Sequence, residues 1–288
     1  MTLAATGSVG EAAERLHVTQ PAVSSVVAAL QKELGVALIQ RDGRRIRLTE
    51  AGGTLATYSR QVLALLEETR DATISRGRPE TGRLRLAAVN TAGEHLLPPL
   101  LASFRIAHPG MELAMEVGNR EAVADLIRSH QVDVVVAGRP PGSGVRSVLV
   151  RPNELLVVAA PAVAEAVDDA GDLAARPWLL REPGSGTRAT TLDFLASRSS
   201  APVQLTLGSN GAIRAGLLLE MGLTLISRDA VGTELDNGNL RRVRCAGPPL
   251  RRHWHAVVRS DPLRPGSTDL FLDHLLRSGG FIRTRAGT

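Results

Sequence analysis

The feature that most constrains the fold is an alternation of short apolar runs and amphipathic segments that begins at residue 83. The run 83–89, RLRLAAV, predicts a strand, 94–110 predict a helix, and 111–117 predict a second strand. A helix over 120–131 and a strand over 132–138 complete a β-α-β-α-β series. Strands that alternate with helices in this way form parallel sheets with helices on both faces. We therefore expect an α/β fold with doubly wound sheets.

The same alternation continues toward the end of the chain, so a second α/β unit is expected. Strands are expected at 153–160, 177–181, 203–207, 223–227 and 254–259, and helices at 161–167, 187–199, 210–222 and 267–279. A chain of 288 residues has room for two or three compact units rather than one.

Four strand-to-helix loops are candidate ligand contacts. In open α/β sheets, ligands bind beyond the C-terminal strand ends, where free N–H groups at helix N-termini favour an anion. Within REPGSGTR, two glycines would let the backbone approach a ligand closely, and two hydroxyls could bind it. A tight strand-to-helix connection with a good cap would explain the same residues, so both interpretations stand. The candidates are Asn90, Thr91, Gly138, Arg139, Gly184, Ser185, Gly186, Thr187, Ser209 and Asn210.

Two helices joined by a short turn are expected before residue 36. Ser8 and Glu11 form the capping-box pattern, in which the hydroxyl and the carboxylate both satisfy free N–H groups at a helix start. That helix should end at His17, and Thr19 can cap a second helix with Pro21 in its first turn. One face of the second helix should be buried, because apolar residues recur at spacings of three and four: Val23, Val26, Val27, Leu30 and Leu34. Gly35 should end it.

Such a pair of helices is typical of a helix-turn-helix, whose second helix enters the DNA major groove by its N-terminus. A β-hairpin with Asp42 and Gly43 at its turn is expected next, over residues 36–49. The net charge of the chain is only +5, but the stretch RDGRRIR places four arginines in this hairpin, suited to phosphates or a narrow minor groove. An ordinary helical bundle with a solvated basic loop would share these features. The candidate DNA contacts are Thr19, Gln20, Pro21, Ser24, Ser25, Arg41, Arg44, Arg45 and Arg47.

A third, long helix should follow, capped by Thr49 and ended by Gly77 and Pro79. It carries a single apolar stripe: Leu55, Tyr58, Val62, Leu65, Leu66 and Thr69. Such a stripe needs a covering surface, either the core of its own chain or a second subunit.

The first fifty residues resemble, almost position for position, the N-terminal domain of LysR-type transcriptional regulators. The resemblance rests on AAERLHVTQPAVS, followed by LG-x-x-L, R-x-x-R and LTEAG. Ser25 stands where this family often has arginine, which removes one phosphate or guanine contact. The family usually has about ten further residues before the equivalent of Thr2, so either the coding start is misplaced or the first helix is short.

The resemblance covers nearly the whole chain and implies three parts. These are a winged helix-turn-helix at 1–50, a linker and dimerisation helix at 51–81, and an effector-binding domain at 82–288. The last part would have two lobes, with lobe I at about 82–152 and 260–288 and lobe II at about 153–259. The loop REPGSGTR resembles the loop that this family uses at its effector cleft, with Thr91 opposite it.

We therefore expect a regulator that binds double-stranded DNA sequence-specifically and responds to a small anionic metabolite bound between the lobes. The resemblance also implies a homodimer through the linker helix and a homotetramer beyond it.

Other classes of protein fit less well. The sequence has no Ser-His-Asp pattern, metal-binding helix motif or dinucleotide fingerprint, so we expect no enzyme and no cofactor. A transporter-associated solute-binding protein would need a signal peptide, and MTLAATGSVGEAAERL does not read as one. No run of 18 apolar residues appears, so we expect no membrane contact and a cytoplasmic location. His253 and His255 could share one strand face, but no carboxylate or cysteine cluster accompanies them, so no metal is expected. Cys245 is the only cysteine, which excludes an intrachain disulfide.

Overall fold

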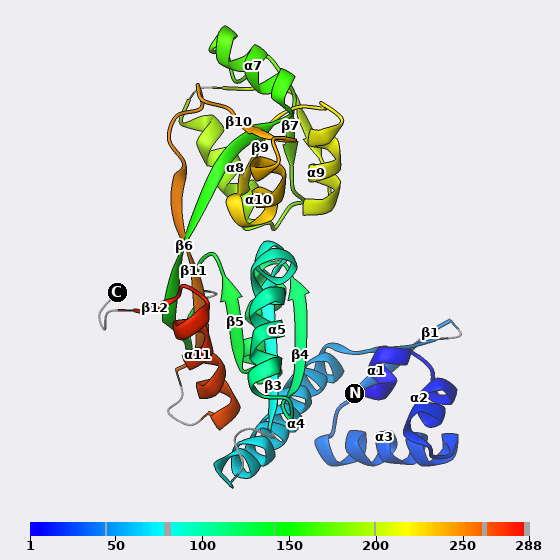
Figure 1. Cartoon of the computed structure of the whole chain (residues 1–288). Coiled ribbons are helices and arrows are strands. Elements are labelled where there is room, and N and C mark those ends of the chain that lie inside the picture. The colour runs from blue at the N-terminus through cyan, green and yellow to red at the C-terminus, as the bar shows by residue number, and fades with distance from the viewer. Residues whose placement is uncertain (44, 78–81, 141, 199, 261–263, 285–288) are drawn as a thin grey trace. The chain divides into compact units, whose positions relative to one another are not determined.

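The computed structural model describes residues 1–43, 45–77, 82–140, 142–198, 200–260 and 264–284. The chain divides into two compact units, Met1–Thr69 and Arg70–Thr288. Figure 1 draws the elements of the first unit in shades of blue, and α4 continues from this unit into the second one. They are α1 (Thr2–Thr6), α2 (Val9–Leu16), α3 (Gln20–Leu34), β1 (Ile39–Asp42), β2 (Arg45–Leu48) and α4 (Glu50–Gly77).

The caps of the first helices follow from local sequence. Ser8 caps α2, because its hydroxyl accepts from the Glu11 N–H at 3.4 Å. The reciprocal half of the expected capping box is not formed, since the Ser8 N–H donates to the Thr6 hydroxyl instead. α2 ends at His17, whose φ of 54° is left-handed. Thr19 caps α3 as expected, and Gly35 ends it with φ of 68°.

The expected buried face of α3 is only partly buried. Val23 belongs to the small core of the first unit, and Val27 packs against that core. The prediction is wrong for Val26, Leu30 and Leu34, which are exposed. The reason is the size of this core: its buried members are Leu3, Ala12, Ala13 and Val23, too few to cover the whole face of a 15-residue helix.

The hairpin is the one expected, with Asp42 paired to Arg45 across the turn. Two hydrogen bonds fix the hairpin against the helices, one with a side chain and one between backbone atoms. The side-chain oxygen of Gln31 on α3 accepts from the N–H of Leu38 at 2.8 Å, and the Ile46 N–H donates to the carbonyl of Gly7 at 2.9 Å. The arginine-bearing hairpin therefore has a fixed position relative to α3.

The long helix α4 begins after Thr49, whose hydroxyl accepts from the Gly52 N–H at 3.0 Å. Its expected apolar stripe is largely exposed: Tyr58, Val62, Leu65 and Leu66 are 47–64% accessible. Only Ala64 and Glu68 are buried among the helix residues beyond Gly52 whose side chains are described. The core of the single chain therefore leaves most of this stripe uncovered.

The second unit begins with three parallel strands in the order β5-β3-β4, which form one end of a larger mixed sheet. These strands are β3 (Arg83–Val89), β4 (Glu112–Gly118) and β5 (Val134–Ala137). Because strand side chains alternate between faces, Leu84, Leu86 and Ala88 lie in one core with helices α5 (Leu97–Ala107) and α11 (Gly266–Ser278). Ala87 lies in another core with α6 (Arg120–Arg128). Helices on both faces make this lobe doubly wound, as expected.

Lobe II repeats the arrangement around shorter strands. β7 (Trp178–Leu180) and β8 (Gln204–Thr206) are parallel, and Leu223, directly before β9 (Thr224–Ser227), forms a parallel bridge with Trp178. One face packs on α7 (Pro161–Ala170) and α8 (Gly186–Ala196), and the other on α9 (Asn210–Leu218) and α10 (Arg228–Asp236).

Two long antiparallel strands link the lobes, and Figure 1 shows them side by side. They are β6 (Val145–Ala159) and β11 (Leu250–Arg259), paired from Val145–Arg259 to Leu155–Leu250. The chain therefore crosses between the lobes twice, as expected. Trp254, Ala256 and Val258 of β11 pack in the core of lobe I, so the second boundary lies within β11 rather than after residue 259.

Several elements have weak sequence signals. The π-helix η2 (Ala92–Leu96) precedes α5, and α10 is a polar helix that the apolar pattern does not predict. The strands β10 (Arg241–Arg242) and β12 (Ile282–Arg283) have two residues each, and both are added at β6. Their positions depend on the partner strand and not on their own composition.

Candidate functional site

The candidate DNA contacts of α3 lie exposed at its first turns. Thr19 accepts from the Ala22 N–H at 3.4 Å, and Pro21 occupies the first turn. The amide of Gln20 lies beside Gly10 of α2, where a Cβ atom would come within 3.3 Å of it. Ser24 and Ser25 are exposed on the next turn. The structure thus brings these five residues together on one end of α3.

The hairpin carries the second group of candidates. Arg41, Arg45 and Arg47 are exposed, while Arg44 lies outside the described residues. The Arg47 guanidinium is 3.6 Å from the Asp42 carboxylate, and both side chains are more than 60% accessible. An ion pair so exposed contributes little, so these arginines are available to a phosphate backbone.

A cavity of about 150 Å³ lies between the two lobes of the second unit. Lobe I contributes the residues at the carboxyl ends of β3 and β5, and lobe II contributes the loop after β7 and the start of α8. Seven of the ten sequence-predicted ligand contacts line it: Asn90, Thr91, Gly138, Arg139, Ser185, Gly186 and Thr187. Loops distant in sequence therefore meet here as the topology predicts.

The N-terminus of α8 points into this cavity. Ser185 caps the helix by accepting from the Arg188 N–H at 3.4 Å, and Gly186 and Thr187 form its first turn. The first N–H groups of a helix have no intrahelical acceptor and carry partial positive charge. The Arg188 guanidinium holds this helix start in place, because it donates to the Arg181 carbonyl and the Thr206 hydroxyl.

The charge around the cavity is positive. Four arginines line it, Arg120, Arg139, Arg181 and Arg252, against the carboxylates of Glu182 and Asp193. Arg181 is paired with Glu182 at 2.8 Å. Among the residues that the structure describes, no hydrogen bond or ion pair engages the guanidinium of Arg120, Arg139 or Arg252. Uncommitted guanidinium groups beside a helix N-terminus favour an anionic ligand.

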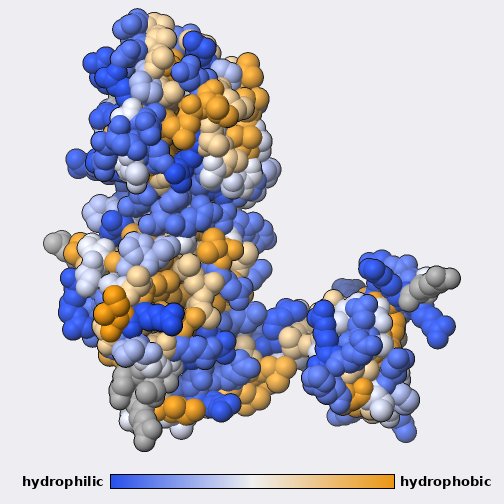
Figure 2. All heavy atoms as spheres, turned by 45° about the vertical axis from the view of Figure 1, so that its right-hand side comes forward, coloured by the Kyte–Doolittle hydropathy of each residue, from blue (hydrophilic) through white to orange (hydrophobic). Residues whose placement is uncertain are grey.

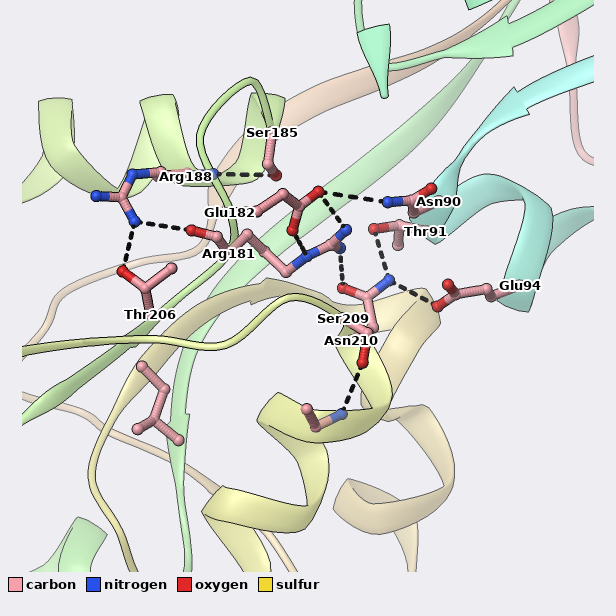
Figure 3. Close-up of polar contacts among 12 residues, drawn as sticks. Asn90, Thr91, Glu94, Arg181, Glu182, Ser185, Arg188, Thr206, Ser209 and Asn210 are labelled. Atoms are coloured by element: carbon pink, nitrogen blue, oxygen red, sulfur yellow. Dashed lines mark hydrogen bonds and ion pairs between the residues drawn. The ribbon is translucent and has the colours of Figure 1, made fainter. Parts of the chain in front are cut away.

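Arg181 is the centre of a buried network that joins the two lobes, shown in Figure 3. It donates to both carboxylate oxygens of Glu182, at 2.8 and 2.9 Å, and to the side-chain oxygen of Asn210 at 2.6 Å. Asn210 in turn donates to the Thr91 hydroxyl at 3.2 Å and to the Glu94 carboxylate at 2.9 Å. Asn210 belongs to lobe II and the last two to lobe I, so the network holds the lobes together.

Asn90 joins this network from lobe I. Its contact with Glu182 in Figure 3 is long, at 3.5 Å. The opposite amide orientation satisfies both of its polar atoms, since it donates to the Gly118 carbonyl at 3.1 Å and accepts from Arg181 at 2.5 Å. The amide of Asn90 therefore has this second orientation.

The remaining three candidates do not line the cavity. Ser209 caps α9, accepting from the Ala212 N–H at 3.1 Å. Asn210 is committed to Arg181, Thr91 and Glu94 and is 1% exposed. Gly184 has a φ of 86°, which favours glycine. It shapes the loop before α8 but does not line the cavity. These residues support the site instead of facing its interior.

Two opposing effects act on the carboxyl of Glu182. Burial alone raises the pKa of its carboxyl, but the hydrogen bonds and charge of Arg181 outweigh burial and set the pKa below its ordinary value.

Sequence reasoning missed several lining residues. Asn119 and Arg120 follow β4, Asn153 lies on β6, and Arg252 and Trp254 lie on β11. The position after β4 is a strand end of the kind already considered, so Asn119 and Arg120 could have been found. The other three lie within the linking strands, and only the pairing of those strands brings them to the cavity.

The candidate metal pair is not part of a larger cluster. The rings of His253 and His255 are 6.4 Å apart, and His255 Nδ1 lies 2.9 Å from the Ser147 hydroxyl. Within the described ranges, no group of three or more His, Cys, Asp or Glu side chains is placed to hold a metal ion. In the same ranges, no helix is both long and apolar enough to cross a membrane.

Both units match known families. Residues 1–53 match the family described as "Bacterial regulatory helix-turn-helix protein, lysR family". Residues 77–280 match the family described as "LysR substrate binding domain".

Individual proteins agree with these matches. The chain is 32% identical over 280 residues to the HTH-type transcriptional activator CmpR of Synechocystis, covering 95% of this chain and 91% of that protein. A full-length OxyR variant from Pseudomonas aeruginosa shares the fold, with a TM-score of 0.72, 22% identity and coverage of 100% and 96% of the two chains. The regulatory domain of Synechocystis CcmR, solved in complex with 2-PG, gives a TM-score of 0.60 at 26% identity, covering 68% and 97%.

Proposed function

The chain belongs to the LysR family of bacterial transcriptional regulators, and from this we propose specific roles for its residues. It is a DNA-binding regulator with an effector domain, and not an enzyme. The proposed parts are the winged head at 1–50, the linker helix at 51–81 and the effector domain at 82–288, with the lobe boundary moved into β11. Because it acts on DNA in a bacterial cell, we place it in the cytoplasm.

We propose that the start of α3 reads base edges and that the hairpin holds phosphates. Gln20, Ser24 and Ser25 supply donors and acceptors suited to the major groove. Arg41, Arg45 and Arg47 supply charge, and Arg44 is proposed from the sequence alone. Thr19 and Pro21 contribute by fixing the helix start against the DNA backbone.

A gel-shift and footprinting series on the DNA upstream of the gene tests this role. We expect sequence-specific protection whose affinity falls with salt. Binding that is salt-sensitive but equal on all sequences, or protection of no site at any salt, would contradict it.

We propose that the cavity binds a small anionic metabolite, with phosphate as the favoured charged group. The single observation that carries this is the set of three uncommitted arginines, Arg120, Arg139 and Arg252, around the N-terminus of α8. The 2-PG complex of the CcmR regulatory domain supports a phosphate-bearing ligand. Asn90, Thr91, Ser185 and Thr187 would add neutral hydrogen bonds.

Ligand binding would act on DNA through the lobes. A ligand shifts a conformational equilibrium only by its different affinity for the two states. The network of Arg181, Glu182 and Asn210 already joins the lobes, so an anion in the cavity would favour the joined state further.

The chain offers a matched pair of variants to test the cavity. Arg252 lines it, whereas the adjacent, exposed Arg251 does not. We expect Arg252→Gln to weaken binding of 2-PG, measured by calorimetry, about tenfold or more, since a charged hydrogen bond is lost. Arg251→Gln should bind as the unaltered protein does. Thr91→Ala and Ser185→Ala should reduce the ligand response while leaving DNA affinity intact. If all four variants bind and respond to the ligand as the unaltered protein does, the proposed site is refuted.

We propose that a homodimer forms through α4 and a homotetramer through additional surfaces. The exposed stripe of α4 supports the dimer, because an apolar face of this length is costly in water. Figure 2 shows apolar side chains gathered on lobe II, where Val203, Leu218, Leu219 and Met221 are exposed. Sedimentation of the Leu66→Glu variant tests the dimer contact through α4. If the variant sediments with the same mass as the unaltered protein, α4 is excluded as the dimer contact.

A further inference from the structure

One wall of the cavity is the indole of Trp254. This residue lies on β11, opposite Arg151 of β6, and is 3% exposed. It lines the cavity together with Arg252, two residues earlier on the same strand face. Across the cavity wall, a ring carbon of Trp254 comes within 3.9 Å of the position that a Cβ atom would take at Gly138. The ring therefore fills the space where the linking strands meet lobe I.

The position of this ring is fixed by Asp229 at the start of α10. The indole N–H of Trp254 donates to the Asp229 carboxylate at 2.7 Å. The same carboxylate accepts from the Arg151 guanidinium at 3.2 Å, so it holds residues of both linking strands. A hydrogen bond to an ionised acceptor is short and strong, and the indole cannot rotate out of the cavity without breaking it.

A second cavity residue is tied to the same turn. The Ser227 hydroxyl donates to the side-chain oxygen of Asn153, which lines the cavity, at 2.8 Å. Ser227 also accepts from the Asp229 N–H at 3.2 Å. Trp254 and Asn153 thus form a wall that is anchored to the β9–α10 turn at two points, and widening the cavity on this side would disrupt both.

The size of the cavity then limits its ligand. A cavity of about 150 Å³ has room for roughly one benzene ring, and this cavity has that size. A compact anion with one phosphate group and a short carbon chain matches it. An anion with a longer carbon chain and two phosphate groups would come into contact with the wall formed by Trp254 and Asn153.

We propose that Trp254, held in place by Asp229, is the residue that determines ligand size and restricts the site to compact anions. This inference rests on the proposed role of the cavity as an anion site. Trp254 is the specificity-determining residue, and Asp229 is a positioning residue that acts through it.

The test compares the Kd of two probes, 2-PG and fructose 1,6-bisphosphate, by calorimetry on the full chain. We expect the unaltered protein to prefer 2-PG, so that the Kd of fructose 1,6-bisphosphate divided by the Kd of 2-PG is above one. Trp254→Ala should reduce this Kd ratio about tenfold or more, mainly through tighter binding of the larger anion. Trp254→Phe, which keeps a smaller aromatic ring at this position, should reduce the Kd ratio less. His253→Ala, an exposed neighbour on the same strand, should leave the ratio unchanged.

The role of Asp229 has a spectroscopic test. The chain has two tryptophans, so in a Trp178→Phe background the fluorescence comes from Trp254 alone. We expect Asp229→Ala to increase quenching of this fluorescence by acrylamide and to reduce the Kd ratio, while Asp229→Asn, whose amide oxygen still accepts from the indole, restores both.

The outcomes separate the two hypotheses. If the unaltered protein binds neither anion, the anion site itself is wrong, and this inference with it. If it binds 2-PG but Trp254→Ala and Trp254→Phe both keep the original Kd ratio, the anion site stands and the size-determining role of Trp254 is overturned. Equal quenching in Asp229→Ala and Asp229→Asn would overturn the positioning role.

Discussion

Replacing Arg181 by methionine should destabilise the second unit by about 3 kcal/mol. The guanidinium is 3% exposed and makes four hydrogen bonds of 2.5–2.9 Å, two to Glu182, one to Asn210 and one to Asn90. Removing one partner of a buried ion pair costs about 3–5 kcal/mol, because the other charge stays buried without compensation. The Glu182 side chain is 29% exposed, so water offsets part of that cost and the lower end of the range applies.

The measurement is urea and thermal unfolding of the full chain near neutral pH, followed by circular dichroism. For a unit of this size, about 3 kcal/mol corresponds to a fall in Tm of roughly 6–12 °C. The double variant Arg181→Met/Glu182→Gln removes the uncompensated charge, so it should recover at least about 1 kcal/mol relative to Arg181→Met. A loss below about 1 kcal/mol in the single variant, or a double variant whose loss is the sum of the two single ones, would refute the assigned role.

Three other changes give independent tests. Gly52→Ala would place a Cβ atom 1.9 Å from the Leu38 carbonyl oxygen, so the unfolding free energy of the first unit should fall by about 1–3 kcal/mol, while Gly53→Ala, which meets nothing within 4 Å, should not lower it. The pKa of Glu182 is depressed in the folded state, so its ionised carboxylate stabilises the fold at pH values above the ordinary pKa. This stabilisation is lost as the pH falls through the pKa of the folded state. Glu182→Gln should therefore flatten the acid limb of the curve of unfolding free energy against pH. Arg45→Ala should reduce the slope of log affinity for DNA against log salt by about 0.9, and an unchanged slope would remove this residue from the interface.

The local features of the head could be predicted because their causes are local. The cap of α2 at Ser8, the cap of α3 at Thr19 and the glycine end at Gly35 each depend on residues within one helical turn. The prediction failed where it needed to know what covers a surface. The spacing of Val26 and Leu30 is that of a buried stripe, yet the small core of the first unit cannot reach them.

The candidate cleft was predictable to the extent that it lies at strand ends. The positions of Thr91, Gly138 and Ser185 follow from one rule, that ligands bind beyond the carboxyl ends of strands, and the structure brings all three to one cavity. The same rule included Ser209 and Asn210, since it cannot distinguish a side chain that faces the cavity from one that supports it. Asn210 does not line the cavity, and its amide is hydrogen-bonded to Arg181, Thr91 and Glu94.

The alternation of apolar runs from residue 83 onward was by itself sufficient to determine an α/β architecture with helices on both faces of its sheets, because side-chain periodicity within a strand or helix is a property of neighbouring residues. Only the tertiary structure decided that the sheets of the two lobes are joined by β6 and β11, and that these strands carry Asn153, Arg252 and Trp254 into the cavity. Their register pairs residues about a hundred positions apart, through hydrogen bonds that the spacing of residues in the sequence does not encode. For that reason the loops of the cleft could be located from the sequence, while the wall that sets its size could not.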